Sequence, residues 1–174
     1  MVKKLITKGA ICLSLAYILG FCDIFKLPFG GGISLESIPL MIFSSIAGPI
    51  GGFIACFTYG LMMLTKPSAF VHPIQFLLDY PLAFSSFFIL GFLKENRKQI
   101  NLWLMSILAF CLRAFWHILS GLLFCKLFLK ELPKNITLYV LSYNASYIVP
   151  TAIICTIIFS FLYSKLKNYF KDSK

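Results

Sequence analysis

The sequence predicts an all-α integral membrane protein, a bundle of about six transmembrane helices built by a single domain over residues 1–174. Hydrophobic residues make up 59% of the chain and charged residues only 13%. So few charges cannot cover a surface that faces water, whereas lipid tails need no polar partner. At about 20 residues for each crossing, plus loops, a chain of this length holds roughly six helices.

Long apolar runs, separated by charges and turn residues, give the boundaries of the expected helices. The first run follows a basic N-terminus, and because Lys8 interrupts it, we interpret it as a retained helix rather than a cleaved signal peptide. The second and third runs are separated by Gly48 and Pro49, a pair typical of a turn. The expected membrane spans are residues 5–22, 37–48, 50–65, 74–93, 101–125 and 143–165.

Basic residues are distributed unequally between the two sides of the expected membrane. Ten fall on the side of the termini: Lys3, Lys4, Lys8, Lys94, Arg97, Lys98, Lys165, Lys167, Lys171 and Lys174. Five fall on the other side: Lys26, Lys66, Lys126, Lys130 and Lys134. The positive-inside rule therefore places both termini in the cytoplasm, which requires an even number of crossings.

The composition also argues against several classes of function. The net charge of +10 does not indicate nucleic-acid binding, because the basic residues form short clusters between apolar runs rather than a stripe. The six cysteines lack the spacing of metal ligands, so we expect them to pack between helices. No GxxxxGK[ST] phosphate-binding motif is present. We therefore expect no metal, no cofactor and no enzymatic activity.

Two ionisable side chains lie inside the expected spans, Asp79 in the fourth and Arg113 in the fifth. On insertion scales such a residue costs about 2.5–3.5 kcal/mol, so it normally faces the bundle interior and has a partner or a task. Gln75 lies four residues before Asp79, which puts both on one helix face, and Tyr80 is adjacent. This face of the fourth span lies in its outer third.

The fifth and sixth spans bring further polar and aromatic residues to the same outer depth. The fifth span contributes His117 and Gly121 at four-residue spacing from Arg113, with Ser120 and Phe124 beside them. The outer end of the sixth contributes Tyr139, Ser142, Tyr143, Asn144 and Tyr147. A shared pocket that opens outward is the economical explanation. Its carboxylate, imidazole, amides and rings suit a flat, partly cationic, heteroaromatic molecule.

Structural explanations remain open for the individual residues of this pocket. Asp79 and Arg113 could form an ion pair within the bundle, and His117 or Asn144 could hydrogen-bond between helices. The tyrosines could belong to a belt at the membrane interface. The convergence of all these residues at one depth favours the pocket.

Four stretches of the chain, in order, resemble the thiamine-specific S component of energy-coupling-factor (ECF) transporters, which is the substrate-binding membrane subunit. They are GGISLESIP at residues 31–39, HPIQFLLDYPLAF at 72–84, FWHILSG at 115–121 and YVLSYNASY at 139–147. The resemblance implies thiamine as the ligand, captured with high affinity from outside the cell while a loop closes over it. It also implies a multi-pass protein of the bacterial plasma membrane.

The resemblance assigns roles to particular residues. It implies that Asp79, followed by Tyr80, contacts the ligand, that His117 does so from the next helix, and that Gly121 leaves room beside it. It implies hydrogen bonds from Tyr139 and Asn144 over the ring system; the remaining predicted substrate-binding residues are Gln75, Ser142, Tyr143 and Phe124. Some family members carry stacking tryptophans where this chain has Gly30 or Gly31 and Cys125, and Phe124, Phe29 or Phe70 are the aromatic candidates here.

The resemblance also implies partners in the membrane and the cytoplasm. An S component docks on a transmembrane coupling protein, and two separate ATPase subunits power release of the ligand inside. Ala10 and Ser14 in the first helix are similar to the small-residue docking motif of the family. Packing within the bundle is the alternative role for this pair.

Three other functions are weighed against a thiamine-binding subunit. The nearest is an S component for a related heterocyclic vitamin or a thiamine precursor. A membrane enzyme could use Asp79 and His117 as an acid–base pair, but the chain has no nucleophile motif or metal-ligand cluster beside them. A structural or channel-forming protein would not need convergent polar residues beneath the glycine-rich outer loop expected at residues 23–36, which contains Gly30, Gly31 and Gly32.

Overall fold

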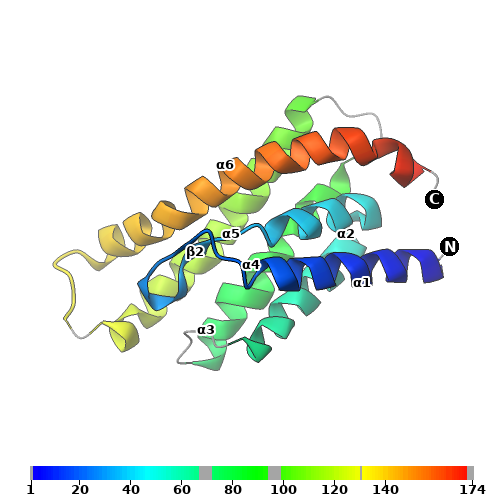
Figure 1. Cartoon of the computed structure of the whole chain (residues 1–174). Helices are drawn as coiled ribbons and strands as arrows, with labels where there is room; N and C mark the ends of the chain where they lie inside the picture. Colours follow the sequence, from blue (N-terminus) through cyan, green and yellow to red (C-terminus); the bar gives the residue numbers. More distant parts are fainter. Residues whose placement is uncertain (1, 67–71, 94–98, 130, 172–174) are drawn as a thin grey trace.

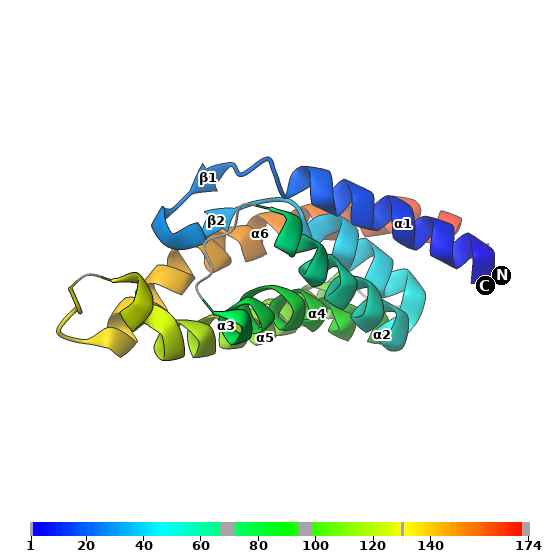
Figure 2. The same ribbon diagram turned by 90° about the horizontal axis from the view of Figure 1, so that it is seen from below.

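The computed structural model describes residues 2–66, 72–93, 99–129 and 131–171 of the chain as an elongated bundle of helices (Figure 1). The two termini lie at one end of the bundle, and a short hairpin lies toward the other end in both views (Figures 1 and 2). Of the lysines and arginines used to predict the orientation, Lys94, Arg97, Lys98, Lys130 and Lys174 lie outside the described residues.

The elements follow in the order expected from the apolar runs. The helix α1 covers Val2–Leu19, and the strands β1 (Phe25–Lys26) and β2 (Gly32–Ile33) flank the 3-10 turn η1 (Pro28–Gly30). Then come α2 (Ser37–Met62), η2 (Met63–Thr65), α3 (Pro73–Leu77), η3 (Leu78–Leu82), α4 (Ala83–Ser85), η4 (Ser86–Phe92), α5 (Gln99–Phe128) and α6 (Ile136–Lys171). The antiparallel pairing of β1 with β2 was not expected, because two strands of two residues have no readable alternation.

The helix α2 is broken at Gly48, where φ is +78°, a conformation that favours glycine. The Tyr59 hydroxyl donates to a Glu36 carboxylate oxygen at 2.6 Å. In a straight helix these residues would be about 35 Å apart at 1.5 Å per residue. The chain therefore reverses direction at Gly48 and Pro49, where the sequence predicts a turn. Gly91 fits against this reversal, since a Cβ there would meet the Gly48 carbonyl carbon at 2.3 Å.

The fourth expected span is irregular rather than one α-helix. A π-helical turn, η3, interrupts it at Leu78–Leu82, and the 3-10 helix η4 completes it. Pro81 lies in the π turn, where its missing N–H group and its ring disfavour regular α-helical hydrogen bonding. The prediction of a continuous span over 74–93 missed this distortion, and it places Asp79 and Tyr80 within the π turn.

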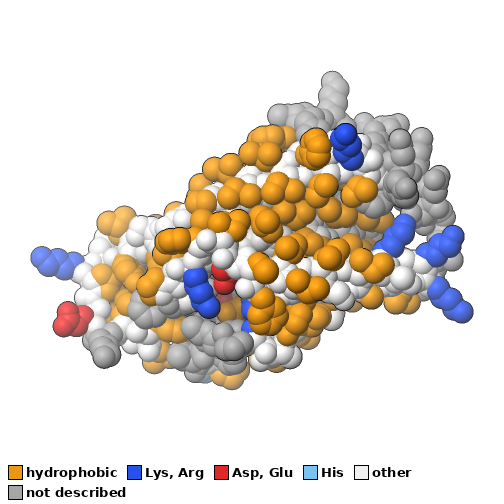
Figure 3. All heavy atoms as spheres, in the orientation of Figure 1, with side chains coloured by type: hydrophobic (Ala, Val, Ile, Leu, Met, Phe, Trp, Pro, Cys, Tyr) orange, Lys and Arg blue, Asp and Glu red, His pale blue; other side chains and the backbone are white. Residues whose placement is uncertain are grey.

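Four described segments are long and apolar enough to cross a membrane: Ser37–Thr65, Pro73–Phe92, Asn101–Phe128 and Ile136–Leu166. The last begins seven residues before the expected span of 143–165, and Tyr139 and Ser142 lie in the first turns of α6. Hydrophobic side chains cover most of the face drawn in Figure 3, and lysine side chains lie mainly toward its ends. Large exposed side chains such as Ile6, Leu123 and Phe161 fit a surface that contacts lipid.

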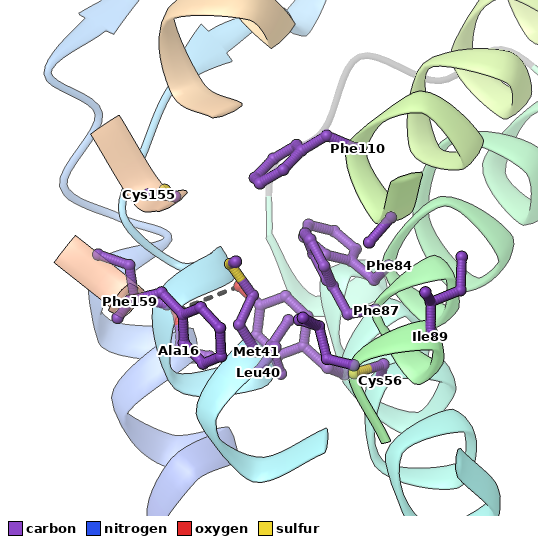
Figure 4. Close-up of a cluster of buried hydrophobic side chains, with 14 of the residues drawn as sticks. Ala16, Leu40, Met41, Cys56, Phe84, Phe87, Ile89, Phe110, Cys155 and Phe159 are labelled. Atoms are coloured by element: carbon purple, nitrogen blue, oxygen red, sulfur yellow. Dashed lines mark hydrogen bonds between the residues drawn. The ribbon is translucent and has the colours of Figure 1, made fainter. Parts of the chain in front are cut away.

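The buried core lies between the two halves of α2, the α3–η4 segment, α5 and α6. Large aromatic side chains fill it, with Phe84, Phe87, Phe110 and Phe159 among the most buried (Figure 4). Ala16 of α1 is fully buried against this cluster (Figure 4), and its carbonyl oxygen lies 3.1 Å from the Tyr59 hydroxyl. This packing fixes the positions of α3, α5 and α6, from which the polar side chains project.

Candidate functional site

A cavity of about 610 Å³ lies between the hairpin, the end of α1, the start of α2, the α3–η3 segment, α5 and α6. Eight of the ten predicted substrate-binding residues line it: Gln75, Asp79, Tyr80, His117, Gly121, Tyr139, Tyr143 and Asn144. The helices bring these residues together from three separate parts of the chain. The structure thus places these eight residues around one cavity.

Asp79 is the centre of the polar wall formed by η3 and α5. Its Oδ2 atom accepts hydrogen bonds from Gln75 Nε2 at 3.1 Å and from the Ser120 hydroxyl at 2.8 Å. Its Oδ1 atom lies 3.1 Å from His117 Nδ1. Three donors hold this carboxylate, and none of them brings a permanent positive charge. The π turn helps to direct Asp79 toward α5, because it changes the angular spacing of side chains around the helix axis.

The hydrogen bonds of His117 indicate which ring nitrogen carries its proton. The Nε–H group of Arg113 donates to His117 Nε2 at 3.5 Å, so this nitrogen acts as an acceptor. The proton then lies on Nδ1, which donates it to Asp79. In this arrangement the imidazole of His117 lies between Arg113 and Asp79 and contacts both.

Arg113 pairs with Glu36 and not with Asp79. Its Nη2 atom lies 3.8 Å from Glu36 Oε1, and its Nη1 atom donates to the Ser37 hydroxyl at 2.7 Å. The guanidinium also lies over the ring of Phe84, 4.4 Å from the centroid. Of the alternatives left open by the sequence, the Asp79–Arg113 ion pair is therefore wrong. Arg113 is tied to the start of α2 instead.

Six acidic or basic side chains line the cavity besides His117. Three are acidic (Asp23, Glu36 and Asp79) and three are basic (Lys26, Lys66 and Arg113). Glu36 and Arg113 neutralise each other, and Asp23 and Lys26 are exposed to solvent. Among the described residues no lysine or arginine forms an ion pair with Asp79, which is held by an amide, a hydroxyl and an imidazole. This carboxylate can therefore face one positive charge on a ligand.

Aromatic side chains form the wall contributed by α6. The rings of Tyr139 and Tyr143 are stacked with centroids 6.3 Å apart, and Tyr143 and Tyr147 meet edge to face at 5.7 Å. The Tyr147 hydroxyl donates to Asn144 Oδ1 at 2.7 Å, while the Asn144 amide donates to the Val140 carbonyl at 2.9 Å. Faces of this kind attract cations and stack on planar rings.

The structure does not bring two of the predicted residues to the cavity. Ser142 is exposed, and its hydroxyl donates to the Tyr139 carbonyl at 3.0 Å. The Phe124 ring stacks on His72 with centroids 5.1 Å apart. Neither is among the described residues of the cavity wall. Of the other stacking candidates, Phe70 and the side chain of Phe29 lie outside the described residues.

Several cavity residues were not predicted as part of the site. Glu36 lies at the end of the glycine-rich loop, where a single acidic residue resembles an ordinary loop charge, yet it is 8% exposed. Arg113 and Tyr147 line the cavity as well; the sequence placed both near the predicted pocket but gave neither a substrate-binding role. The polar spacing that identified Asp79 and His117 could not identify Glu36, because its partner lies 77 positions away in the chain.

Ala10 and Ser14 are both exposed on α1 and lie outside the cavity wall. The same helix exposes Ile6, Ile11, Leu15 and Ile18. The alternative that Ala10 and Ser14 pack within the bundle is therefore wrong for this chain. Their surface is open to lipid or to another membrane protein.

Comparisons with known proteins agree with this architecture. A sequence model of the family described as "Thiamine transporter protein (Thia_YuaJ)" matches residues 6–171. The thiamine transporter ThiT of Bacillus subtilis is 31% identical over 163 residues, which cover 86% of this chain and 83% of that protein. A solved structure of ThiT from Listeria monocytogenes, 24% identical, matches with a TM-score of 0.79 and covers 95% of this chain and 96% of that chain.

Proposed function

Because the chain belongs to the thiamine transporter family, we propose that it is the thiamine-binding S component of an ECF importer in a bacterial plasma membrane. The observation that supports this most strongly is the cavity in which a carboxylate without a lysine or arginine partner, Asp79, lies near a wall of tyrosines. Thiamine carries one permanent positive charge and two planar heteroaromatic rings. Both features complement the groups that line the cavity.

The proposal gives Asp79 the central role in binding. A carboxylate held by an amide, a hydroxyl and an imidazole can accept N–H groups of an aminopyrimidine or face a cationic ring. His117, Tyr80, Tyr139 and Asn144 are proposed to contact the two rings from either side. Gln75 and Ser120 orient the carboxylate, and Gly121 leaves space between α5 and α6. No step of this binding requires catalysis.

The proposed membrane arrangement has six crossings, with both termini in the cytoplasm. The reversal of α2 at Gly48 supports this count, since it turns one long apolar segment into two antiparallel halves. The common end of the termini and the ten basic residues expected on that side support the orientation. In this orientation the hairpin and the cavity lie toward the outside.

The direct test is a titration of the purified protein with thiamine, followed by intrinsic fluorescence. Trp116 adjoins His117, so its emission is expected to be quenched on binding. A Trp116→Phe variant measured by calorimetry keeps the binding while most of the optical signal is lost. If thiamine does not bind but a thiamine pyrimidine or another vitamin does, the assignment of the ligand is overturned.

Docking on a coupling protein and two ATPase subunits is proposed to use the surface around Ala10 and Ser14. Small side chains on an exposed helix face let a second helix approach closely. Changing both residues to tryptophan is expected to abolish assembly with the coupling protein while thiamine binding remains. Leu123→Trp, on an exposed part of α5, is the matched control and is expected to assemble normally. Normal assembly of the double variant would contradict this surface.

A further inference from the structure

The hairpin formed by β1, η1 and β2 makes one wall of the cavity. Lys26, Leu27 and the glycines at 30–32 all line it. The hairpin holds itself together by main-chain bonds from Ile24 N–H to Ile33 O at 2.8 Å and from Leu27 N–H to Gly31 O at 2.7 Å. A two-stranded hairpin of this length is not stable alone, so contacts with the helices must hold it in place.

Tyr143 of α6 supplies two such contacts through one hydroxyl group. The Gly31 N–H donates to the Tyr143 oxygen at 3.0 Å, and the Tyr143 hydroxyl donates to the Pro28 carbonyl. These two groups lie on either side of the tip of the hairpin. A phenol has one proton to donate, and here the Pro28 carbonyl accepts it. Tyr143 therefore has no proton left for a bound ligand while the hairpin is seated.

Gly31 lies so close to α6 that these hydrogen bonds can form only if the residue at this position has no side chain. A Cβ at Gly31 would lie 2.7 Å from the Tyr143 hydroxyl and 2.9 Å from the Tyr147 ring, which real Cβ contacts essentially never show. Only a residue without a side chain lets the hairpin approach α6 so closely. The contact is thus specific to the backbone of Gly31 and the phenol of Tyr143.

We propose that Tyr143 is a positioning residue whose hydroxyl latches the hairpin closed over the cavity, and that it controls how long a ligand stays bound. This rests on the proposed function only in taking thiamine as the ligand. Tyr143 acts through residues 28–31 and not by contact with the ligand. Opening the hairpin requires the two hydrogen bonds at Tyr143 to break, so the latch determines the dissociation rate.

The first test needs no ligand. Hydrogen exchange is measured by mass spectrometry on the unliganded protein in lipid nanodiscs, following the peptide that spans residues 24–33. Tyr143→Phe keeps the ring but removes both hydrogen bonds, so exchange in this peptide is expected to accelerate about tenfold. Tyr17→Phe is the matched control, because its hydroxyl bonds to Thr65 Oγ1 at 2.7 Å outside the cavity wall. Unchanged exchange in Tyr143→Phe overturns the latch.

The second test separates a latch from a direct ligand contact. With Tyr143→Phe, thiamine dissociation is expected to become about tenfold faster while association changes less than about threefold. Gly31→Ala is expected to have a similar effect, because it prevents the hairpin from seating. The double variant is expected to dissociate no faster than Gly31→Ala alone, since the latch is already open. If Tyr143→Phe has its full effect in the Gly31→Ala background, Tyr143 contacts the ligand and the proposal is wrong.

The two tests also distinguish failure of the latch from failure of the proposed function. If the protein does not bind thiamine but its hairpin exchanges faster in Tyr143→Phe, the latch is supported and the assignment of thiamine is wrong. If the protein binds thiamine but its hairpin exchanges at the same rate in the parent and in Tyr143→Phe, the assignment of thiamine stands and the latch is wrong.

Discussion

Glu36 and Asp79 are both acidic, both line the same cavity, and have very different partners. Glu36 faces the guanidinium of Arg113 and the hydroxyl of Tyr59, so its charge is balanced within the protein. Asp79 faces an amide, a hydroxyl and an imidazole, which orient its charge without cancelling it. The carboxylate of Glu36 thus links the start of α2 to α5, whereas the carboxylate of Asp79 is available to a ligand.

The difference teaches that a buried charge must be judged by its partners rather than by its burial. Losing one member of a buried ion pair leaves an uncompensated charge in a medium of low dielectric constant. Losing a carboxylate held by neutral donors leaves hydrogen bonds to be rearranged but no opposite charge. We therefore expect changes at Glu36 to act on stability and changes at Asp79 to act on binding.

The largest effect is expected from Glu36→Gln. Removal of this charge leaves Arg113 without its ion-pair partner, and breaking a buried pair costs about 3–5 kcal/mol. The free energy of unfolding in detergent is expected to fall by about 3 kcal/mol. The double variant Glu36→Gln with Arg113→Met removes both charges and is expected to recover most of this loss. If the single variant is as stable as the parent, the pair has no structural role.

A large effect on affinity, with little on stability, is expected from Asp79→Asn. Truncating the charged partner of a buried ligand contact costs about 2–5 kcal/mol, so the Kd for thiamine is expected to rise more than about a hundredfold. The melting temperature without ligand is expected to change little, because no lysine or arginine among the described residues forms an ion pair with Asp79. Calorimetric titration and a thermal unfolding scan on the same sample measure both. Unaltered thiamine binding would rule out a role for this carboxylate.

The sequence alone predicted the Asp79 region far better than the Glu36 region. Asp79, Gln75, His117 and Gly121 recur at helical spacing inside apolar runs, and periodicity makes such residues visible. Glu36 follows a loop and meets Arg113 only because α2 begins beside α5, which no local pattern encodes. The π turn at Asp79 escaped prediction for the same reason, since it depends on packing around Pro81.

The bundle itself could be predicted because a bilayer imposes strict requirements on length and polarity. The turn at Gly48 and Pro49 was readable from two residues whose backbone preferences are strong. The helix α6 begins at Ile136, seven residues before the expected membrane span of 143–165, so its first two turns include Tyr139 and Ser142. Asn135 in fact accepts the Leu138 N–H through its side chain at 3.0 Å, as a helix cap does.

A smaller effect is expected from Tyr59→Phe, which removes a neutral partner of Glu36 but keeps the ring. The lost hydroxyl donates to Glu36 at 2.6 Å and lies 3.1 Å from the Ala16 carbonyl. A hydrogen bond to a charged group contributes about 1.5 kcal/mol, so the free energy of unfolding is expected to fall by about that amount. Thiamine affinity is expected to stay within about twofold, because Tyr59 is not among the described residues of the cavity wall. If Tyr59→Phe lowers the affinity for thiamine without lowering stability, Glu36 and its partners take part in binding, and the separation of roles between Glu36 and Asp79 is wrong.

The smallest effects are expected from two serines, of which the sequence predicted Ser142 but not Ser120 as a substrate-binding residue. Ser120 donates to Asp79 at 2.8 Å, whereas Ser142 donates to the carbonyl of Tyr139 on the exposed side of α6. Ser120→Ala is expected to weaken thiamine binding about fivefold, because one of the three groups that orient the carboxylate is lost. Ser142→Ala is expected to change the Kd less than about twofold. Titration of both variants under one set of conditions tests this, and a larger effect at Ser142 would mean that the ligand reaches beyond the cavity that the side chains enclose.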